Sequence, residues 1–93
     1  MSLTWTPRRH LLLHAIAAGQ IVVEHYGRIR WANRTVTATV GDLRAARLVV
    51  LSRTDSTDSV ELTSKGEWTL HQWDSDHPKH AEQARREVEE MAA

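Results

Sequence analysis

The most constraining feature of this 93-residue sequence is the segment 35–70, where a helical spacing of apolar residues is followed by two short segments typical of strands, separated by a polar stretch. Val36, Val40 and Leu43 recur at i, i+4 and i+7, so they line one side of a helix. The residues on the opposite side are small or polar. The spacing predicts an amphipathic helix over residues 35–47 that buries one side and exposes the other.

Two segments that follow this helix are typical of strands: residues 47–51, which are apolar after Arg47, and residues 60–63, where apolar and polar residues alternate. The intervening stretch 53–59 contains no apolar residue, so it predicts a polar, mobile loop between two paired strands. Asp55 and Asp58 in this loop would repel phosphate. The loop is therefore expected to act mainly as a spacer.

The N-terminal third predicts a helix followed by a β-hairpin. Thr6 can cap a helix that has Pro7 at its first position and continues to Gly19. The segment 20–31 then alternates between apolar and polar residues, with a turn at Tyr26-Gly27. We expect a hairpin here, and a helix over part of this segment is the alternative.

Two helices are predicted at the C-terminal end. The first begins at Thr63 or Ser64, and the second runs over residues 78–91. Small or apolar residues recur at coiled-coil spacing along the second helix: Ala81, Ala84, Val88 and Met91. This seam predicts a dimerisation tail over residues 75–93, attached to a domain formed by residues 1–74. Folding of the tail back onto its own domain, or a frayed helix in solution, is the alternative.

Two segments resemble bacterial winged-helix regulators. Residues 39–49, with the sequence Thr-Val-Gly-Asp-Leu-Arg-Ala-Ala-Arg-Leu-Val, resemble the end of a winged-helix recognition helix. Residues 62–70 are similar to the Leu-Thr-x-x-Gly-x-x-x-Leu segment that often follows the wing. Two departures from the family are that Arg47 stands where Gly is usual, and that the predicted hairpin replaces a short helix.

The resemblance implies an α+β, winged-helix-like fold of bacterial or phage type, which belongs to the helix-turn-helix superfamily. Its elements would be an N-terminal helix, a β-hairpin, a recognition helix, a two-stranded wing and the C-terminal helices.

Charge is distributed unevenly along a chain whose net charge is zero. Residues 1–53 contain eight arginines and only Glu24 and Asp42 as acids, which gives +6, and residues 54–93 carry the compensating −6. Guanidinium groups suit bidentate contact with phosphate or base edges, so a basic front half indicates an anionic partner. A GC-rich genome is the alternative explanation for the arginine content.

Together these features predict a DNA-binding transcriptional regulator that places the N-terminal part of the 35–47 helix in the major groove. The predicted contacts combine small side chains with arginines that reach phosphate or guanine: Arg28, Arg30, Arg34, Thr35, Thr37, Ala38, Arg44 and Arg53. The predicted partners are double-stranded DNA and a second copy of the chain. The alternative is a protein–protein interaction module or adaptor subunit on the same fold, which the zero net charge and the acidic loop favour.

The sequence offers little support for a metal site. His10 and His14 are four residues apart on the first helix, but no third ligand is evident near them, and the same holds for His77 and His80. The polar connector 74–78 is predicted to break the helix that precedes it. We therefore expect no metal and no other cofactor.

Catalysis and membrane insertion are also not expected. The chain has no Cys, no Gly-rich phosphate loop and no paired carboxylates within an apolar stretch, so no enzyme activity is predicted. No apolar run approaches the roughly 20 residues of a membrane helix, and the N-terminus does not resemble a signal peptide. The predicted location is the cytoplasm.

Overall fold

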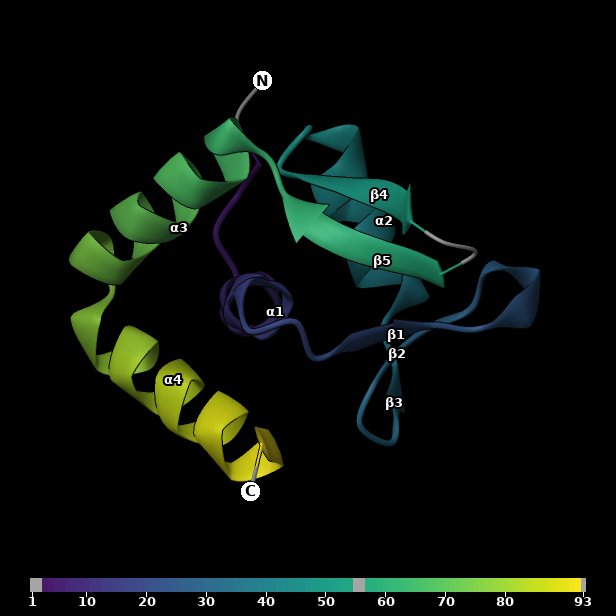
Figure 1. The fold of residues 1–93 in the computed structure, drawn as a ribbon. Coiled ribbons are helices and arrows are strands. Elements are labelled where there is room, and N and C mark those ends of the chain that lie inside the picture. Colours follow the sequence, from purple (N-terminus) through teal and green to yellow (C-terminus); the bar gives the residue numbers. More distant parts are fainter. Residues whose placement is uncertain (1–2, 55–56, 93) are drawn as a thin grey trace.

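The computed structural model, which describes residues 3–54 and 57–92, has an α+β fold with four α-helices and two small antiparallel sheets among these residues. The elements in chain order are α1 (Pro7–Ala17), β1 (Ile21–Val23), the 3-10 turn η1 (His25–Gly27), β2 (Ile29–Trp31), β3 (Arg34–Thr35), α2 (Thr37–Ala45), β4 (Val49–Thr54), β5 (Thr57–Leu62), α3 (Ser64–Asp76) and α4 (Pro78–Ala92). Helix α1 lies at the centre, with α3 and α4 along one side and two hairpins pointing away on the other (Figure 1).

Helix α1 begins as the sequence predicts and ends at Ala17, two residues before the predicted end. The Thr6 hydroxyl accepts a hydrogen bond from the backbone N–H of Arg9 at 3.1 Å, and Pro7 occupies the first turn. Gly19, just beyond the helix, has a positive φ of 72°. Apolar residues of α1 contribute to the centre of the core: Leu12, Leu13, Ala15 and Ile16.

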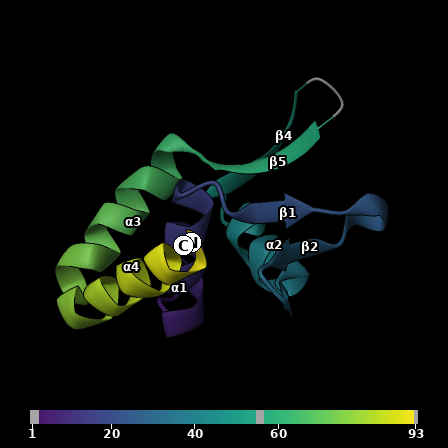
Figure 2. The same cartoon turned by 60° about the horizontal axis from the view of Figure 1, so that its bottom comes forward.

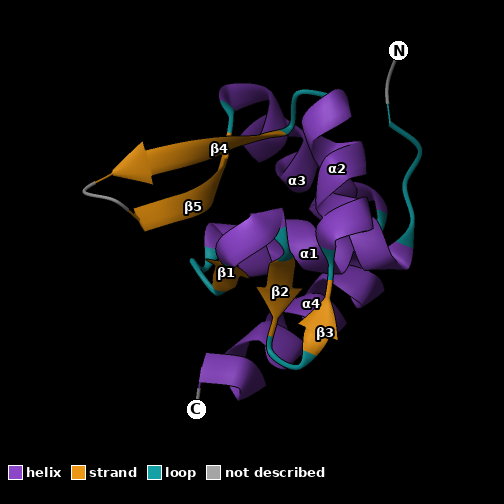
Figure 3. Cartoon of the chain, turned by 90° about the vertical axis from the view of Figure 1, so that its right-hand side faces the viewer, coloured by secondary structure: helices purple, strands orange, loops and turns teal. Residues whose placement is uncertain are grey.

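The predicted hairpin over residues 20–31 is confirmed. Strands β1 and β2 pair antiparallel, with Ile21 opposite Trp31, and the turn passes through Tyr26 and Gly27, which both have positive φ. A third strand, β3, was not predicted and pairs with β2. Figure 3 shows this three-stranded sheet apart from the β4–β5 hairpin.

Helix α2 is two residues shorter at each end than the predicted 35–47 helix. At its start, the N–H of Val36 donates to the Ile29 carbonyl at 2.8 Å, which keeps the preceding residues extended beside β2. Thr35, predicted as the first residue of the helix, therefore lies in β3 beside Arg34, and this part of the prediction was wrong. At the other end, Arg47 adopts a φ of 64°, so an arginine takes the left-handed conformation for which Gly is usual.

The Leu-Thr-x-x-Gly segment fastens α3 to the end of α2. Thr63 caps α3 by accepting from the Gly66 N–H at 3.0 Å, and its hydroxyl donates to the Arg47 carbonyl at 2.6 Å. A Cβ atom at Gly66 would overlap the carbonyl of Leu48. Only glycine permits this close approach, so the segment has a clear packing role.

The stretch 53–59 is mostly a strand ladder, and the loop predicted there was too long. Arg53 pairs with Asp58 in the register of β4 and β5, and the hairpin extends to Thr57. Threonine and serine are compatible with extended backbone, so a polar stretch need not be a loop. Residues 55–56, which include the predicted repulsive Asp55, lie outside the described residues.

Helix α4 folds back across α1 (Figure 2). Three of the four seam residues are buried within the chain: Ala81, Ala84 and Val88. The Gln20 side chain donates to the Val88 carbonyl at 2.7 Å and accepts from the Trp31 indole N–H at 2.9 Å. The structure thus shows the fold-back alternative, and a dimer through these three residues would require α4 to leave its position. The oligomeric state itself stays a prediction.

Helix α3 continues to Asp76, so the break predicted over 74–78 is confined to His77 between the two helices. Asp74 is therefore a helical residue, and α3 sets the direction of its side chain. Among the described residues, none of the helices combines the length and apolar character that a membrane span requires.

Candidate functional site

An open groove lies between the η1 turn, the outer side of α2 and the β4–β5 hairpin, and its volume is about 1140 Å³. Four of the predicted DNA contacts line it: Arg28, Thr37, Arg44 and Arg53. Gly41, at the middle of α2, lies at the groove without a side chain to fill it. The fold thus brings half of the residues predicted to contact DNA to one concave surface.

The three arginines reach this groove from three different elements. Arg28 follows the turn of the first hairpin, Arg44 lies in the last turn of α2, and Arg53 lies in β4. All three side chains belong to exposed residues. Exposed guanidinium groups keep their hydration until a partner arrives, so they can exchange water for phosphate at low cost.

Acidic residues reduce the positive charge of the groove. Arg53 lies 3.7 Å from Asp58, and Glu24 lies 3.6 Å from Arg30. Both acids line the groove, so it holds three arginines and two carboxylates. Such surface pairs contribute little stability and are weakened by salt, so the arginines can change partners.

The remaining predicted contacts lie elsewhere. Arg34 and Thr35 are exposed on β3, where the Arg34 guanidinium lies 5.9 Å from the centre of a Trp31 ring. Arg30, in β2, is half-buried beside Glu24. Ala38 is exposed on α2 but does not line the groove. Half of the predicted contacts therefore line the groove, and the other half lie outside it.

Thr37 has a structural contact that the sequence did not reveal. Its hydroxyl accepts a hydrogen bond from the Ile29 N–H at 2.9 Å, which ties the start of α2 to β2. A hydroxyl held in this way has less freedom to read a base edge. Thr37 is better described as a residue that positions α2.

Arg9 was not predicted as a functional residue, yet it reaches the outer side of α2. It lies 3.3 Å from the exposed carboxylate of Asp42 and donates to the Thr4 carbonyl at 2.7 Å. The pairing offsets the negative charge that Asp42 places on α2. The only sequence signal was an arginine in the first turn of the preceding helix.

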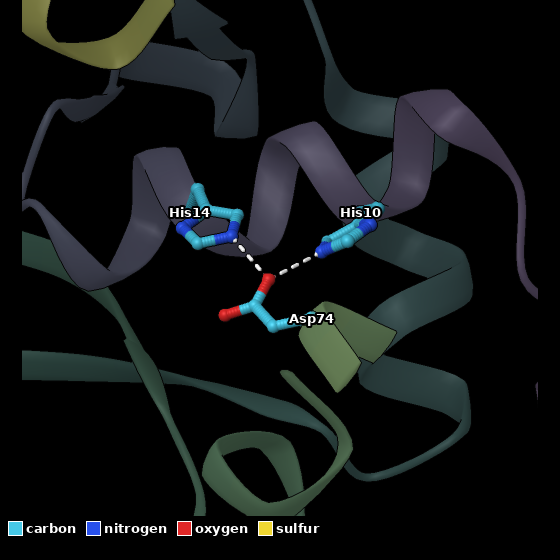
Figure 4. A group of neighbouring side chains, drawn as sticks. All are labelled: His10, His14 and Asp74. Carbon is cyan, nitrogen blue, oxygen red and sulfur yellow. Dashed lines mark hydrogen bonds and ion pairs between the residues drawn. The ribbon is translucent and has the colours of Figure 1, made fainter. Parts of the chain in front are cut away.

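A second constellation lies on the other side of α1, between α1, α3 and α4. The Nε2 atoms of His10 and His14 each lie 2.7 Å from the same oxygen, Oδ1, of Asp74 (Figure 4). His10 is fully buried, whereas His14 and Asp74 are half-buried. Arg85, on α4, lies 3.6 Å from the other carboxylate oxygen of Asp74.

Aromatic and imidazole rings surround His10. The indole N–H of Trp5 donates to His10 Nδ1 at 3.1 Å, and His80 Nδ1 lies 3.2 Å from the same atom. The Trp5 ring stacks on His77 with 3.8 Å between ring centres. Four of the six histidines in the sequence thus meet at this place.

These contacts fix the protonation of His10. An indole N–H can only donate, so Nδ1 of His10 must accept, and in the neutral ring the proton lies on Nε2, facing Asp74. Burial lowers the pKa of His10, although the bond to Asp74 opposes this effect. Burial also lowers the pKa of His80. Near neutral pH both rings are uncharged.

Asp74 is held in its charged form. Burial favours the neutral carboxyl, but hydrogen bonds from His10 and His14 outweigh burial and keep the pKa of Asp74 below its ordinary value. The cluster is therefore one carboxylate that accepts two imidazole N–H groups.

Sequence reasoning identified the His10–His14 pair but found no third ligand. Asp74 lies sixty residues beyond His14, in a segment interpreted as a helix break.

In comparisons with known proteins, no family model matches the chain, and no curated protein or solved structure is significantly similar to it.

Proposed function

We propose that this protein is a cytoplasmic, winged-helix-like DNA-binding regulator of bacterial or phage type, and that the groove between its two hairpins contacts the duplex. The observation that carries the proposal is the convergence of Arg28, Arg44 and Arg53 from three separate elements on one open surface. Since a duplex presents phosphates in regular rows, several separated guanidinium groups fit it better than they fit a single small anion.

The outer side of α2 is the element proposed to lie closest to the DNA. Ala38 and Gly41 are exposed and small, so the helix backbone can approach base edges without a steric barrier. Arg44 is the residue of α2 proposed to reach guanine or phosphate. Arg28 and Arg53, on the flanking hairpins, would contact the backbone and fix the register of the helix.

This arrangement has a measurable salt dependence. If the three arginines neutralise three phosphates, the logarithm of affinity falls with the logarithm of salt concentration at a slope of about −2.7. An increase from 50 to 200 mM salt would then weaken binding about 40-fold.

The test is a fluorescence-anisotropy titration of the full chain with mixed-sequence duplexes at several salt concentrations. Replacement of Arg44 by Ala should weaken binding and make the salt slope less steep by about 0.9. The matched control is Arg86→Ala, since Arg86 is an exposed arginine on α4 that pairs with Glu82. Absence of duplex binding at low salt, or an equal effect of Arg86→Ala, would contradict the proposal.

A protein-interaction module is the second candidate, and particular features of the groove favour it. One carboxylate oxygen of Glu24, Oε1, is buried without a hydrogen-bond partner among the described residues, and a protein partner could supply the donor. Tyr26 is fully exposed at the tip of the first hairpin. Tyrosine is enriched in protein interfaces. Under this alternative, Tyr26→Ala would abolish partner binding, and no duplex would bind at any salt concentration.

A further inference from the structure

The cluster of His10, His14 and Asp74 has the geometry of a metal-binding site. One ligand atom from each residue, two imidazole nitrogens and one carboxylate oxygen, lies within 4.8 Å of the others. His10 and His14 are one helical turn apart on α1, so the helix itself aims both rings in one direction. Helix α3 supplies Asp74 from across the interface (Figure 4).

We propose that these three residues bind a first-row divalent transition metal ion, with Zn²⁺ as the representative ion. Imidazole nitrogen and carboxylate oxygen are common Zn²⁺ ligands, whereas Mg²⁺ and Ca²⁺ favour sites made only of oxygen. Three protein ligands leave at least one coordination position for water or another small ligand. Asp74 and His14 are partly exposed, so solvent reaches the edge of the cluster.

Metal binding requires the three ligand atoms to adjust in two ways: the two imidazole nitrogens, which now lie within 4.8 Å of each other, must approach, and Asp74 must withdraw slightly. A tetrahedral Zn²⁺ with bonds of about 2.0–2.1 Å keeps its ligand atoms roughly 3.3 Å apart. The two contacts to Asp74 Oδ1 are each 2.7 Å, so each must lengthen by roughly 0.6 Å to admit the ion. Rotation of the partly exposed Asp74 side chain can lengthen its two contacts, and rotation of the partly exposed His14 ring can bring its Nε2 closer to that of His10.

The hydrogen atoms must also be rearranged. A metal ion binds an imidazole nitrogen that carries no proton. Nε2 of His10 now carries the proton of the neutral ring, so on metal binding this proton must move to Nδ1. His80 Nδ1 lies 3.2 Å away and can accept that proton in a hydrogen bond. The indole N–H of Trp5, which now donates to the same Nδ1, must give up this bond. His80 is thus a supporting residue, and Trp5 is a competitor of the metal.

A purely structural hydrogen-bond network is the competing explanation for the same contacts. Each imidazole N–H already has an acceptor in Asp74, and Arg85 adds charge compensation. The two explanations differ in what the chain does when Zn²⁺ is added, because only a metal site gains stability from the ion.

The experiment uses the full chain without an affinity tag, treated with EDTA and then exchanged into chelator-free buffer. We expect one Zn²⁺ per chain by isothermal titration calorimetry. We also expect a rise in Tm of roughly 10–20 °C when free Zn²⁺ is about 100 times the dissociation constant. His14→Ala and Asp74→Asn should each weaken Zn²⁺ binding by more than tenfold.

The matched control is His71→Ala, since His71 is an exposed histidine on α3 outside the cluster, and it should bind Zn²⁺ as the wild type does. His14 is only half-buried, so the His14→Ala variant keeps the test decisive if Asp74→Asn fails to fold. The proposal is overturned if Zn²⁺ leaves the Tm of the folded wild type unchanged. It is also overturned if His14→Ala binds Zn²⁺ as tightly as the wild type, or if His71→Ala loses binding equally.

Discussion

The charged groups of the groove and those of the histidine cluster differ in burial and in the length of their contacts. In the groove between the hairpins, arginines and acids are exposed and their pairs are loose, at 3.6 and 3.7 Å. In the cluster between α1, α3 and α4, Asp74 receives two contacts of 2.7 Å, one of them from the fully buried His10. Loose exposed pairs are easily exchanged for a partner, whereas tight buried ones hold a structure together.

This difference assigns separate roles to the two regions. The groove should respond to salt and to polyanions and contribute little to stability. The cluster should make the largest polar contribution to the free energy of unfolding. That contribution should depend on pH and on metal ions and should be almost independent of salt concentration.

The largest expected difference is between two aspartate substitutions. Asp74→Ala leaves the buried His10 N–H without an acceptor and should reduce the free energy of unfolding by about 3 kcal/mol. Asp58→Ala, in the groove, should change it by less than about 0.5 kcal/mol. Urea denaturation measures both values, and equal effects of the two substitutions would remove the distinction between the regions.

The cluster should make stability dependent on pH, measured in EDTA to exclude metal. The pKa of His10 is lower in the folded chain than its ordinary value of 6.5, so the unfolded chain binds more protons as pH falls below that value. Stability should therefore be complete above pH 6.5 and be lost as pH falls, by at most about 1.4 kcal/mol per pH unit for this histidine. Asp74, whose pKa is also lowered, adds a second loss below its ordinary value of 3.8.

The control for this pH dependence is His25→Ala, since His25 is an exposed histidine in the η1 turn next to the groove. Its unfolding free energy should follow the wild-type curve between pH 8 and pH 5. If removal of His25 flattened the curve, the histidines of the cluster would not be its source.

A smaller effect on Zn²⁺ affinity tests whether the Trp5 indole N–H opposes metal binding or supports it. Trp5→Phe keeps an aromatic ring next to His77 but removes the N–H that donates to His10. The variant should bind Zn²⁺ roughly fivefold more tightly, because one net hydrogen bond no longer opposes the metal. Calorimetric titration measures the ratio, and weaker binding by Trp5→Phe would show that the indole N–H does not oppose the ion.

The smallest expected effect concerns the arginines of the groove. Arg28→Ala and Arg53→Ala should each change the free energy of unfolding by less than about 0.5 kcal/mol, since both side chains are exposed. Thermal or urea denaturation provides the measurement. A large loss of stability would indicate that these arginines hold the hairpins in place, and it would weaken their assignment to binding.

Elements defined by local spacing were predictable from the sequence. The cap at Thr6 and the hairpin turn at Tyr26-Gly27 depend on residues close to them in the chain, and both are present. The left-handed conformation of Arg47 was not predicted, because Arg lacks the freedom that makes Gly usual at this position. The start of α2 was missed by two residues because it depends on a contact between Val36 and Ile29, which spacing alone does not reveal.

The cluster was less accessible to sequence reasoning than the groove. The pattern Asp74-Ser75-Asp76 is polar enough to indicate a break, yet α3 continues through it. Only the packing of α3 against α1 brings the Asp74 carboxylate to His10 and His14. Long-range assembly of this kind leaves no periodic signal in the chain, although the two histidine pairs were visible.

The most direct test of the proposed DNA contact is a map of backbone amide chemical shifts in the ¹⁵N-labelled full chain with and without a mixed-sequence duplex at low salt. We expect the largest changes in the η1 turn, in the exposed residues of α2 around Gly41 and at Arg53, with little change in α4. Unchanged spectra, or changes centred on α4 and the histidine cluster, would contradict the assignment of the groove as the nucleic-acid surface.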